Sequence, residues 1–150
     1  MPWASTDPLL PALSEFVERS VTQADGGEEF RYAMWDDQAS ILVGSCGLHR
    51  RLGPRRLEIG YWVRTGWLRR GIATAAGRAL TTCAFALPDI DEVHIHCDEA
   101  NVASSGVPRQ LGFTLARIVE QPVTAPAEIG RSMEWVVGRD QWRRMPVPAD

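Results

Sequence analysis

Hydrophobic and polar residues alternate along several short stretches of this chain, and each alternation predicts a β-strand. The clearest stretch runs from Leu57 to Val63, where Leu57, Ile59, Tyr61 and Val63 fall on one face. The same pattern, bounded by turn residues, predicts further strands at residues 28–35, 40–49, 92–98, 113–119 and 131–137. Asp36-Asp37 is a turn signal between the first two of these, so they are expected to form a hairpin.

Other stretches repeat hydrophobic residues every three or four positions, which is typical of helices. The central one covers residues 72–87, with a stripe formed by Ile72, Ala76, Leu80, Cys83 and Leu87. An earlier helix is expected after a cap at Asp7, with a stripe of Leu9, Leu10, Leu13, Phe16, Val17 and Val21. A short third helix is expected at residues 101–111, ending at Gly112.

The order of these elements predicts a mixed α/β (α+β) fold around one mostly antiparallel sheet. The strands before and after the central helix are expected to lie parallel, because the helix provides the crossover between them. Gly44 and Gly47, inside the strand at 40–49, indicate either a bulge or a close approach of another backbone. The length of 150 residues suits a single domain, residues 1–150.

Composition narrows the class of protein. The net charge of −3 argues against a general nucleic-acid binder, and no run of about 18 apolar residues predicts a membrane span. Three cysteines without a C-x-x-C motif make a disulfide framework unexpected and fit a reducing compartment. No basic-then-apolar leader is seen at the N-terminus, so the expected location is cytoplasmic.

The loop between the central strand and the central helix is the first candidate site. It contains Arg69-Arg70-Gly71 immediately before the helix, and a helix start offers unpaired N–H groups and a positive dipole end to phosphate. The sequence therefore favours a pyrophosphate site. A steric role for the glycine and solvated arginines remain the alternative. The loop is not a P-loop, since the chain contains no lysine.

Two segments resemble the signatures of one family. Glu58-Ile-Gly-Tyr-Trp-Val63, followed by Arg69-Arg-Gly-Ile-Ala-Thr74, resembles the acetyl-CoA-binding region of GNAT N-acetyltransferases. Asn101-Val-Ala-Ser104, with Val107-Pro108 and Leu111-Gly-Phe113, resembles the second signature, and the strand at 44–49 fits the ribosomal-protein alanine N-acetyltransferase branch. The resemblance implies a GNAT-like sheet with helices on both faces and a parallel pair that splays apart at the cofactor.

The same resemblance implies acetyl-CoA as co-substrate, with no metal. Its pantetheine arm would pair with the backbone of Trp62, Val63 and Arg64, and Asn101 is a further candidate to hold it. Its pyrophosphate would accept hydrogen bonds from the backbone amides around the helix start, which belong to Arg69, Gly71, Ile72, Ala73 and Thr74. Arg70 would add positive charge. Leu68 departs from the family pattern, which usually has Gln or Arg there.

Catalytic candidates also come from the resemblance. Glu58 matches the general base of family members, and Ser104 holds the position of a proposed general acid. For Glu58 the alternatives are a solvent-facing charge on a half-buried strand or an ion-pair partner for Arg56. For Ser104 the alternative is a role in the start of a short helix that Asn101 caps. Family members often use a tyrosine acid, but neither Tyr32 nor Tyr61 lies on the expected helix.

Two further features bear on the site. His94 and His96 share one face of their strand, but two histidines without a third ligand are expected to be surface residues rather than metal ligands. Family members begin with a further strand and helix that the resemblance does not find here, which indicates a misassigned start, a truncated gene or an edge supplied by another chain. Without that further strand, the strand at 28–35 would be an edge, so a monomer or a homodimer is expected.

The expected function is transfer of acetyl from acetyl-CoA to a primary amine by direct attack in a ternary complex. A protein or peptide N-terminus is the first choice of acceptor: an α-amine has a pKa of about 7.7–8.0, so it needs less help from a base than lysine does. A small amine of the aminoglycoside kind is the alternative within the enzyme class. A non-catalytic acyl-CoA-binding module is the alternative outside it.

Overall fold

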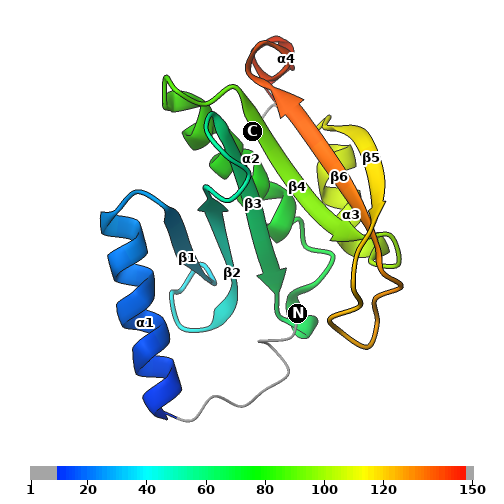
Figure 1. The fold of residues 1–150 in the computed structure, drawn as a ribbon. Helices are drawn as coiled ribbons and strands as arrows, with labels where there is room; N and C mark the ends of the chain where they lie inside the picture. The colour runs from blue at the N-terminus through cyan, green and yellow to red at the C-terminus, as the bar shows by residue number, and fades with distance from the viewer. Residues whose placement is uncertain (1–9, 148–150) are drawn as a thin grey trace.

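The computed structural model describes residues 10–147 of the chain. Its elements, shown in Figure 1, are α1 (Leu10–Asp25), β1 (Glu29–Trp35), β2 (Leu42–His49), β3 (Arg56–Val63), the short 3-10 helix η2 (Thr65–Trp67), α2 (Ile72–Ala86), β4 (Glu92–Asp98), α3 (Val102–Gln110), β5 (Thr114–Glu120), β6 (Arg131–Gly138) and α4 (Arg139–Arg144). The predicted order of strands and helices is confirmed, and α4 is an addition in the tail. The predicted cap Asp7 lies outside the described residues.

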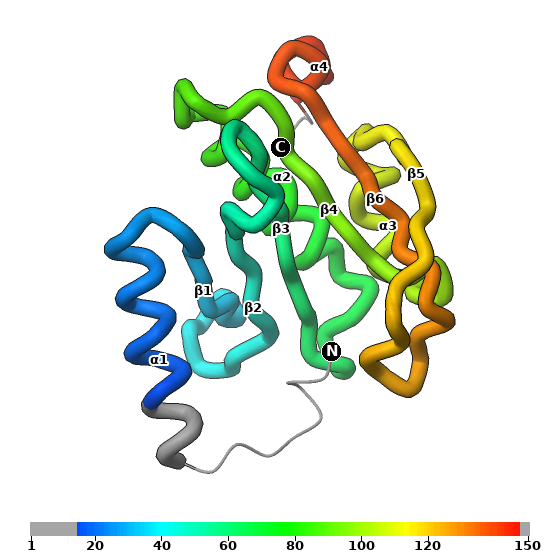
Figure 2. The backbone as a smooth tube through the Cα atoms, in the orientation of Figure 1, coloured from blue at the N-terminus to red at the C-terminus, as the bar shows by residue number. Residues whose placement is uncertain are grey.

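The six strands form one sheet in the order β1-β2-β3-β4-β6-β5 (Figure 2). Every neighbouring pair is antiparallel except β3 and β4, which flank α2 along the chain and run parallel. The mixed α/β class with a mostly antiparallel sheet is therefore confirmed. β1 and β5 are the two edges. No helix in the described part of the chain has the length and apolar character that crossing a membrane requires.

The parallel pair separates halfway along its length. β3 and β4 are paired only from Arg56 opposite Glu92 to Ile59 opposite Ile95. Beyond that point β3 stays paired with β2 as far as Val63, and β4 stays paired with β6 as far as Asp98. β2 holds β3 and β6 holds β4, while the facing edges of β3 and β4 diverge. This divergence opens the gap in the sheet that the resemblance predicted.

The two faces of the sheet differ in character. One face forms the core, where side chains from β3, β4 and β6 meet α2 and α3; its residues include Leu57, Ile59, Val93, Ile95, Val137, Leu80, Ala84, Val107 and Leu111. Fully burying one such aliphatic side chain contributes about 1.5–3 kcal/mol. The other face carries α1, whose Ser20 and Gln23 accept hydrogen bonds from Arg31 Nη1 at 3.1 and 2.8 Å. Helices therefore cover both faces.

Three residues of the hydrophobic stripe predicted for the first helix are exposed. Phe16, Val17 and Val21 are 40%, 52% and 56% exposed. The sequence pattern could not show this, because an amphipathic period says which residues share a face and not what covers that face. Within residues 10–147, no strand pairs with the outer edge of β1.

Gly44 and Gly47 are both sites of close backbone approach, and Gly44 also adjoins a bulge. A Cβ atom on Gly44 would lie 2.3 Å from the carbonyl oxygen of Trp62, and one on Gly47 would lie 2.5 Å from that of Phe30. Both positions therefore need glycine for space. The register steps from Met34 opposite Gly44 to Trp35 opposite Leu42, so the extra residue, Val43, lies on β2 beside Gly44.

Candidate functional site

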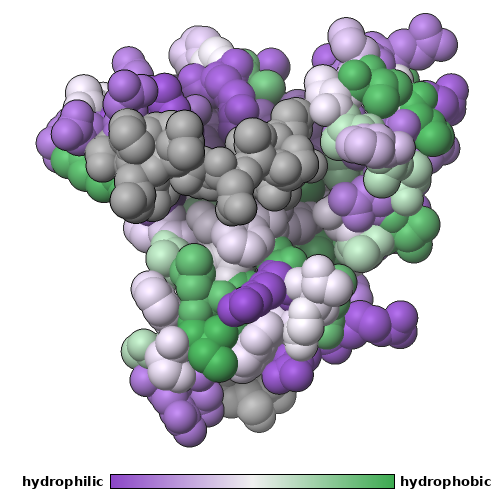
Figure 3. All heavy atoms as spheres, turned by 90° about the horizontal axis from the view of Figure 1, so that it is seen from below, coloured by the Kyte–Doolittle hydropathy of each residue, from purple (hydrophilic) through white to green (hydrophobic). Residues whose placement is uncertain are grey.

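A groove of about 890 Å³ lies where β3 ends, between the loop that leads into α2 and the first turns of α3. It is lined by most of the predicted cofactor residues, namely Trp62, Val63, Arg69, Gly71, Ile72, Ala73, Thr74 and Asn101, and by the predicted acid Ser104. Its other lining residues had not been predicted to bind the cofactor or to act in catalysis; they are Tyr61, Trp67, Leu68, Val102, Ala103, Gly106, Val107 and Gln110. Figure 3 looks onto this end of the molecule, where hydrophobic side chains lie beside hydrophilic ones.

The start of α2 has the geometry of an anion site. Gly71 is the N-cap residue, with a left-handed φ of 74° and no side-chain cap on the helix amides. Arg69 also has a left-handed φ, of 60°. Left-handed positions beside a helix start are a common way to gather backbone N–H groups into an anion-binding concavity. A Cβ atom at Gly71 would meet no protein atom within 4 Å, so the space above this backbone is open to a ligand. These features fit a pyrophosphate.

The backbone of β3 narrows which residues can pair with a pantetheine arm. The amide of Arg64 donates to the carbonyl of Val43 at 2.8 Å, so it points toward β2. Backbone groups of alternate strand residues point to opposite edges. The groups of Tyr61 and Val63 therefore face the gap, while Arg64 can contribute only its side chain. Of the three predicted partners, Val63 is the one whose backbone is placed for this role.

The three loop arginines are placed differently. Arg69 lines the groove, whereas Arg64 and Arg70 do not. The Arg70 guanidinium lies 4.4 Å from the centre of the Trp67 ring, and its Nη2 donates to the carbonyl of Gly66 at 3.3 Å. It stiffens the loop in this arrangement. Stacking on a ring is a typical use of arginine that a sequence pattern does not distinguish from anion binding.

The start of α3 separates the two neighbouring serines. The Asn101 side chain accepts the amide of Ser104 at 3.1 Å, so Asn101 caps α3 as well as lining the groove. Ser105 is buried and its hydroxyl donates to the carbonyl of Val102 at 3.0 Å, which is a structural role. Among the described residues, the Ser104 hydroxyl has no hydrogen-bond partner, so it remains the candidate acid.

Tyr61 is a groove residue that the sequence did not assign to the site. Its hydroxyl donates to the carbonyl of Ser104 at 2.9 Å, across the gap between β3 and α3. Burial raises the pKa of this phenol, so it stays protonated as a donor. Its place on the inward face of β3 was predicted by the alternation from Leu57 to Val63. Its partner on α3 lies 43 residues away along the chain, and no local pattern shows it.

The predicted base Glu58 lies on the opposite face of the sheet from Ser104. It lines a cavity of about 240 Å³ together with residues of β4 and of the β5–β6 loop. Its side chain is 16% exposed, and its Oε2 lies 3.5 Å from Arg51 Nε and 4.0 Å from His96 Nδ1. The carboxylate is therefore partly buried beside Arg51, whereas Arg56, the ion-pair partner expected for it, pairs with Glu92. The register places Glu58 one residue before the last β3–β4 pair, at the edge of the gap.

The loop that closes this cavity is held by Asp98, the last residue of β4. Its carboxylate accepts the amides of Ala100, Ile129 and Gly130, at 2.9, 3.2 and 3.0 Å. The same loop contains Glu128, which accepts the amide of Thr124 at 2.8 Å. The Asp98 and Glu128 carboxylates are thus used in shaping the wall. Glu58, the third carboxylate that lines this cavity, accepts no such backbone amide in the described structure.

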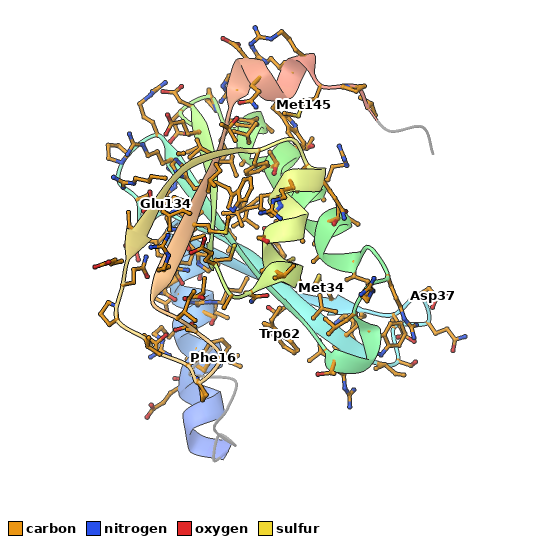
Figure 4. All side chains as sticks on the ribbon, turned by 90° about the vertical axis from the view of Figure 1, so that its right-hand side faces the viewer. Phe16, Met34, Asp37, Trp62, Glu134 and Met145 are labelled. Carbon is orange, nitrogen blue, oxygen red and sulfur yellow. The ribbon has the colours of Figure 1, made fainter. Side chains whose placement is uncertain are left out.

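Glu134 is a second carboxylate on this face, but it is a poor base. Arg117 Nε donates to its Oε2 at 2.5 Å, and this hydrogen bond holds the pKa of Glu134 below its ordinary value. Figure 4 shows Glu134 on the side of β5 and β6 that faces away from α3. Among the described residues, no group of three His, Cys, Asp or Glu side chains is arranged to hold a metal ion.

Comparison with known proteins agrees with this geometry. The sequence profile of the acetyltransferase (GNAT) domain matches residues 1–114. A Bacillus subtilis (strain 168) protein named "Putative ribosomal N-acetyltransferase YdaF" is 41% identical over 73 residues; the match covers 48% of this chain and only 40% of that protein.

Two solved structures share the fold. The ribosomal-protein-S5-alanine acetyltransferase of Vibrio fischeri has a TM-score of 0.77 at 14% identity, covering 88% of this chain and 73% of that one. RimL, a ribosomal L7/L12 alpha-N-protein acetyltransferase in complex with coenzyme A, has a TM-score of 0.74 at 22% identity, covering 85% and 71%. The predicted resemblance is confirmed, and the chain belongs to the GNAT acetyltransferase family.

Proposed function

We propose that residues 1–150 act as a single N-acetyltransferase domain, which transfers acetyl from acetyl-CoA to the α-amine of a protein or peptide. The observation that carries the proposal is the gap between β3 and β4. One of its faces opens onto the groove with an anion-binding helix start, and the other has a carboxylate, Glu58, in a cavity. The ribosomal-protein acetyltransferases among the relatives support a protein acceptor.

In this arrangement the two substrates approach from opposite faces of the sheet. The groove residues would hold the cofactor, with phosphates at the start of α2 and the arm along Val63. The amine would enter the cavity beside Glu58, which would accept its proton as the nitrogen attacks the thioester carbonyl directly. The departing thiolate would take a proton on the groove side, where Ser104 is the candidate donor. When bound, acetyl-CoA supplies the activated acyl group.

The first test separates cofactor binding from turnover. The melting temperature of the chain is measured with and without acetyl-CoA; at 100 times Kd, binding adds about 2.7 kcal/mol. Arg69→Glu, which reverses a charge lining the groove, is expected to reduce the shift. Arg143→Glu, on exposed α4, is the matched control and should leave the shift unchanged.

Turnover is then followed as CoA release with a panel of peptides that have free N-termini. Glu58→Gln is expected to keep the acetyl-CoA shift and to lose most of the amine-dependent release. An acetyl-CoA shift without CoA release from any amine would instead favour the non-catalytic acyl-CoA-binding module. A cooperative melt without any shift would overturn the proposal.

A small amine remains the second candidate acceptor. The cavity beside Glu58, at about 240 Å³, has room for the terminal residue of a peptide or for part of a small polyfunctional amine. An aminoglycoside in the same CoA-release assay distinguishes the two. A higher kcat/KM for the aminoglycoside than for every peptide would assign the enzyme to small amines.

A further inference from the structure

A row of acid and base side chains crosses the polar face of the sheet, with one member from each of its six strands. The row follows the register from Glu29 (β1) through His49 (β2) to Glu58 (β3), and from His96 (β4) through Glu134 (β6) to Arg117 (β5). Between its two halves it is offset by two residues, because the register partner of Glu58 on β4 is His94. Acids and bases alternate along the row. His49 Nδ1 lies 3.3 Å from Glu29 Oε1, and His96 Nδ1 lies 4.0 Å from Glu58 Oε2.

From this row we infer that His96 is the proton-relay partner of Glu58: it positions that carboxylate and takes the amine proton from it. The inference rests on the proposed function and extends it by one residue. His96 lines the same cavity as Glu58. The expectation that His96 is a surface strand residue is wrong, because only 19% of its side chain is exposed.

The position of His96 relative to the gap supports this role. The last parallel pair joins Ile59 to Ile95, so His96 is the first residue of β4 beyond the paired region. The position expected opposite it on β3 is Gly60, which has no side chain to fill the space. His96 therefore lies at the point where the sheet opens, beside the side chain proposed to meet the amine.

The chemistry of the ring fits the step. As the amine nitrogen forms its bond to the acetyl carbon, its proton passes to a Glu58 oxygen, and the C–S bond then breaks. The proton moves from Glu58 to Nδ1 of His96, which leaves Glu58 ionised for the next amine, and His96 then releases the proton to solvent through the cavity that both residues line. A separation of 4.0 Å is longer than a hydrogen bond, but such contacts commonly shorten when substrate binds. His96 Nε2 is buried without a hydrogen-bond partner in the described structure.

Charged groups flank His96 on both sides. Glu58 lies on one side of His96, and Glu134 is its register partner on the other. The negative charge of both carboxylates attracts a proton that arrives at the ring. The opposing groups are the His94 ring, with its centroid 5.9 Å away, and the cations of Arg51 and Arg117, each of which lies against one of the two carboxylates.

Two further carboxylates belong to the surroundings of His96. Asp98 and Glu128 line the same cavity, from the end of β4 and from the β5–β6 loop. Both accept backbone amides, which hold the pKa of Glu128 low. At Asp98 burial raises the pKa, but several backbone amides together outweigh it and the pKa is lowered. Both carboxylates stay ionised over the pH range in which a histidine titrates, so they add constant negative charge without their own step in a pH profile.

The test is the pH profile of kcat/KM for the amine at saturating acetyl-CoA, in wild type, His96→Gln and His94→Gln. His94 is the matched control: it lies two residues earlier on the same face, outside the cavity, and bonds to Glu92 at 3.0 Å. His96→Gln is expected to lower kcat/KM near neutral pH roughly tenfold or more and to lose the histidine limb of the profile. KM for acetyl-CoA should not change, and added imidazole should restore part of the rate to His96→Ala.

Glu134→Gln provides a second variant should His96→Gln fold poorly. Removing this carboxylate, the register partner of His96, is expected to lower kcat/KM for the amine while KM for acetyl-CoA stays unchanged. The inference is overturned if His96→Gln keeps the wild-type profile, if His94→Gln changes it equally, or if Glu134→Gln leaves kcat/KM for the amine unchanged. A wild type that binds acetyl-CoA but never turns over would overturn the relay together with the proposed enzyme, whereas an active wild type with an unaffected His96→Gln overturns the relay alone.

Discussion

Replacing Gly44 by alanine tests how much the close approach of β2 to β3, beside the groove, contributes to the free energy of unfolding. The new Cβ atom would lie 2.3 Å from the carbonyl oxygen of Trp62 and 3.2 Å from the Cα of Val63. A carbon–oxygen contact relaxes to about 3.3 Å, so β3 would have to move by about 1 Å relative to β2. Forcing extra atoms into a packed site costs about 1–3 kcal/mol.

A matched control isolates that cost. Replacing any glycine by alanine also lowers the entropy of the unfolded chain, which stabilises by about 0.4–1 kcal/mol. Gly138→Ala has this effect without the clash, since a Cβ atom there meets nothing within 4 Å and its φ is −89°. For a chain of this length, 1 kcal/mol corresponds to roughly 2–4 °C in Tm, so Gly44→Ala should melt roughly 2–12 °C below Gly138→Ala.

The same variant links stability to the cofactor. Trp62 and Val63 line the groove, so displacing them should also weaken acetyl-CoA binding, measured as a smaller ligand-induced shift in Tm. Equal melting temperatures and equal acetyl-CoA shifts in Gly44→Ala and Gly138→Ala would refute the reasoning.

Three other substitutions have defined outcomes. Arg139→Ala should lower the free energy of unfolding in urea by about 1.5–3 kcal/mol, because the Arg139 guanidinium donates to three carbonyls at the end of α2 and in the loop after it. The control is Arg143→Ala on exposed α4, which should change the free energy of unfolding by less than about 0.5 kcal/mol. Tyr61→Phe should cost about 0.5–1.5 kcal/mol by leaving the Ser104 carbonyl without its donor; an unchanged unfolding midpoint would contradict the contact. For Asp98, burial raises the pKa but the backbone N–H donors lower it further, to below its ordinary 3.8, so the stabilisation is complete above that pH and is lost as pH falls. The Tm difference between wild type and Asp98→Asn should therefore shrink below about pH 4, and a difference that is constant down to pH 2.5 would disprove this.

The sequence predicted the sheet well because its strands have one buried face. The alternation from Leu57 to Val63 places Leu57 and Ile59 in the core, and a shift by one residue would have exposed both. The short helix α4 was not predicted, since six residues are too few to show a hydrophobic period and the tail around them is rich in proline.

Long-range pairing explains what the sequence could not show at the site. The groove lining was predicted from contiguous motifs, but the direction of the Arg64 amide depends on the register with β2. The partnership of Glu58 with His96 depends on the register with β4, and Glu134 meets Arg117 only because β5 folds back onto β6. Ser104 lines the groove, whereas Ser105 is buried. Because the two serines are adjacent in the motif, the sequence does not show which of them faces the groove.

The divergence of β3 and β4 also has a mechanical consequence. The sheet consists of two three-stranded halves, β1-β2-β3 and β4-β6-β5, which are joined by the few residue pairs from Arg56–Glu92 to Ile59–Ile95. A ligand that fills the gap and pairs with Val63 extends this short seam toward the open end, so the halves would hinge less against each other. The N–H groups of Tyr61 and Val63 face the gap, so slower amide hydrogen exchange at these two residues would report the stiffening directly. The rigidity of the wall that an acceptor meets in the Glu58 cavity would then depend on whether the cofactor has already bound.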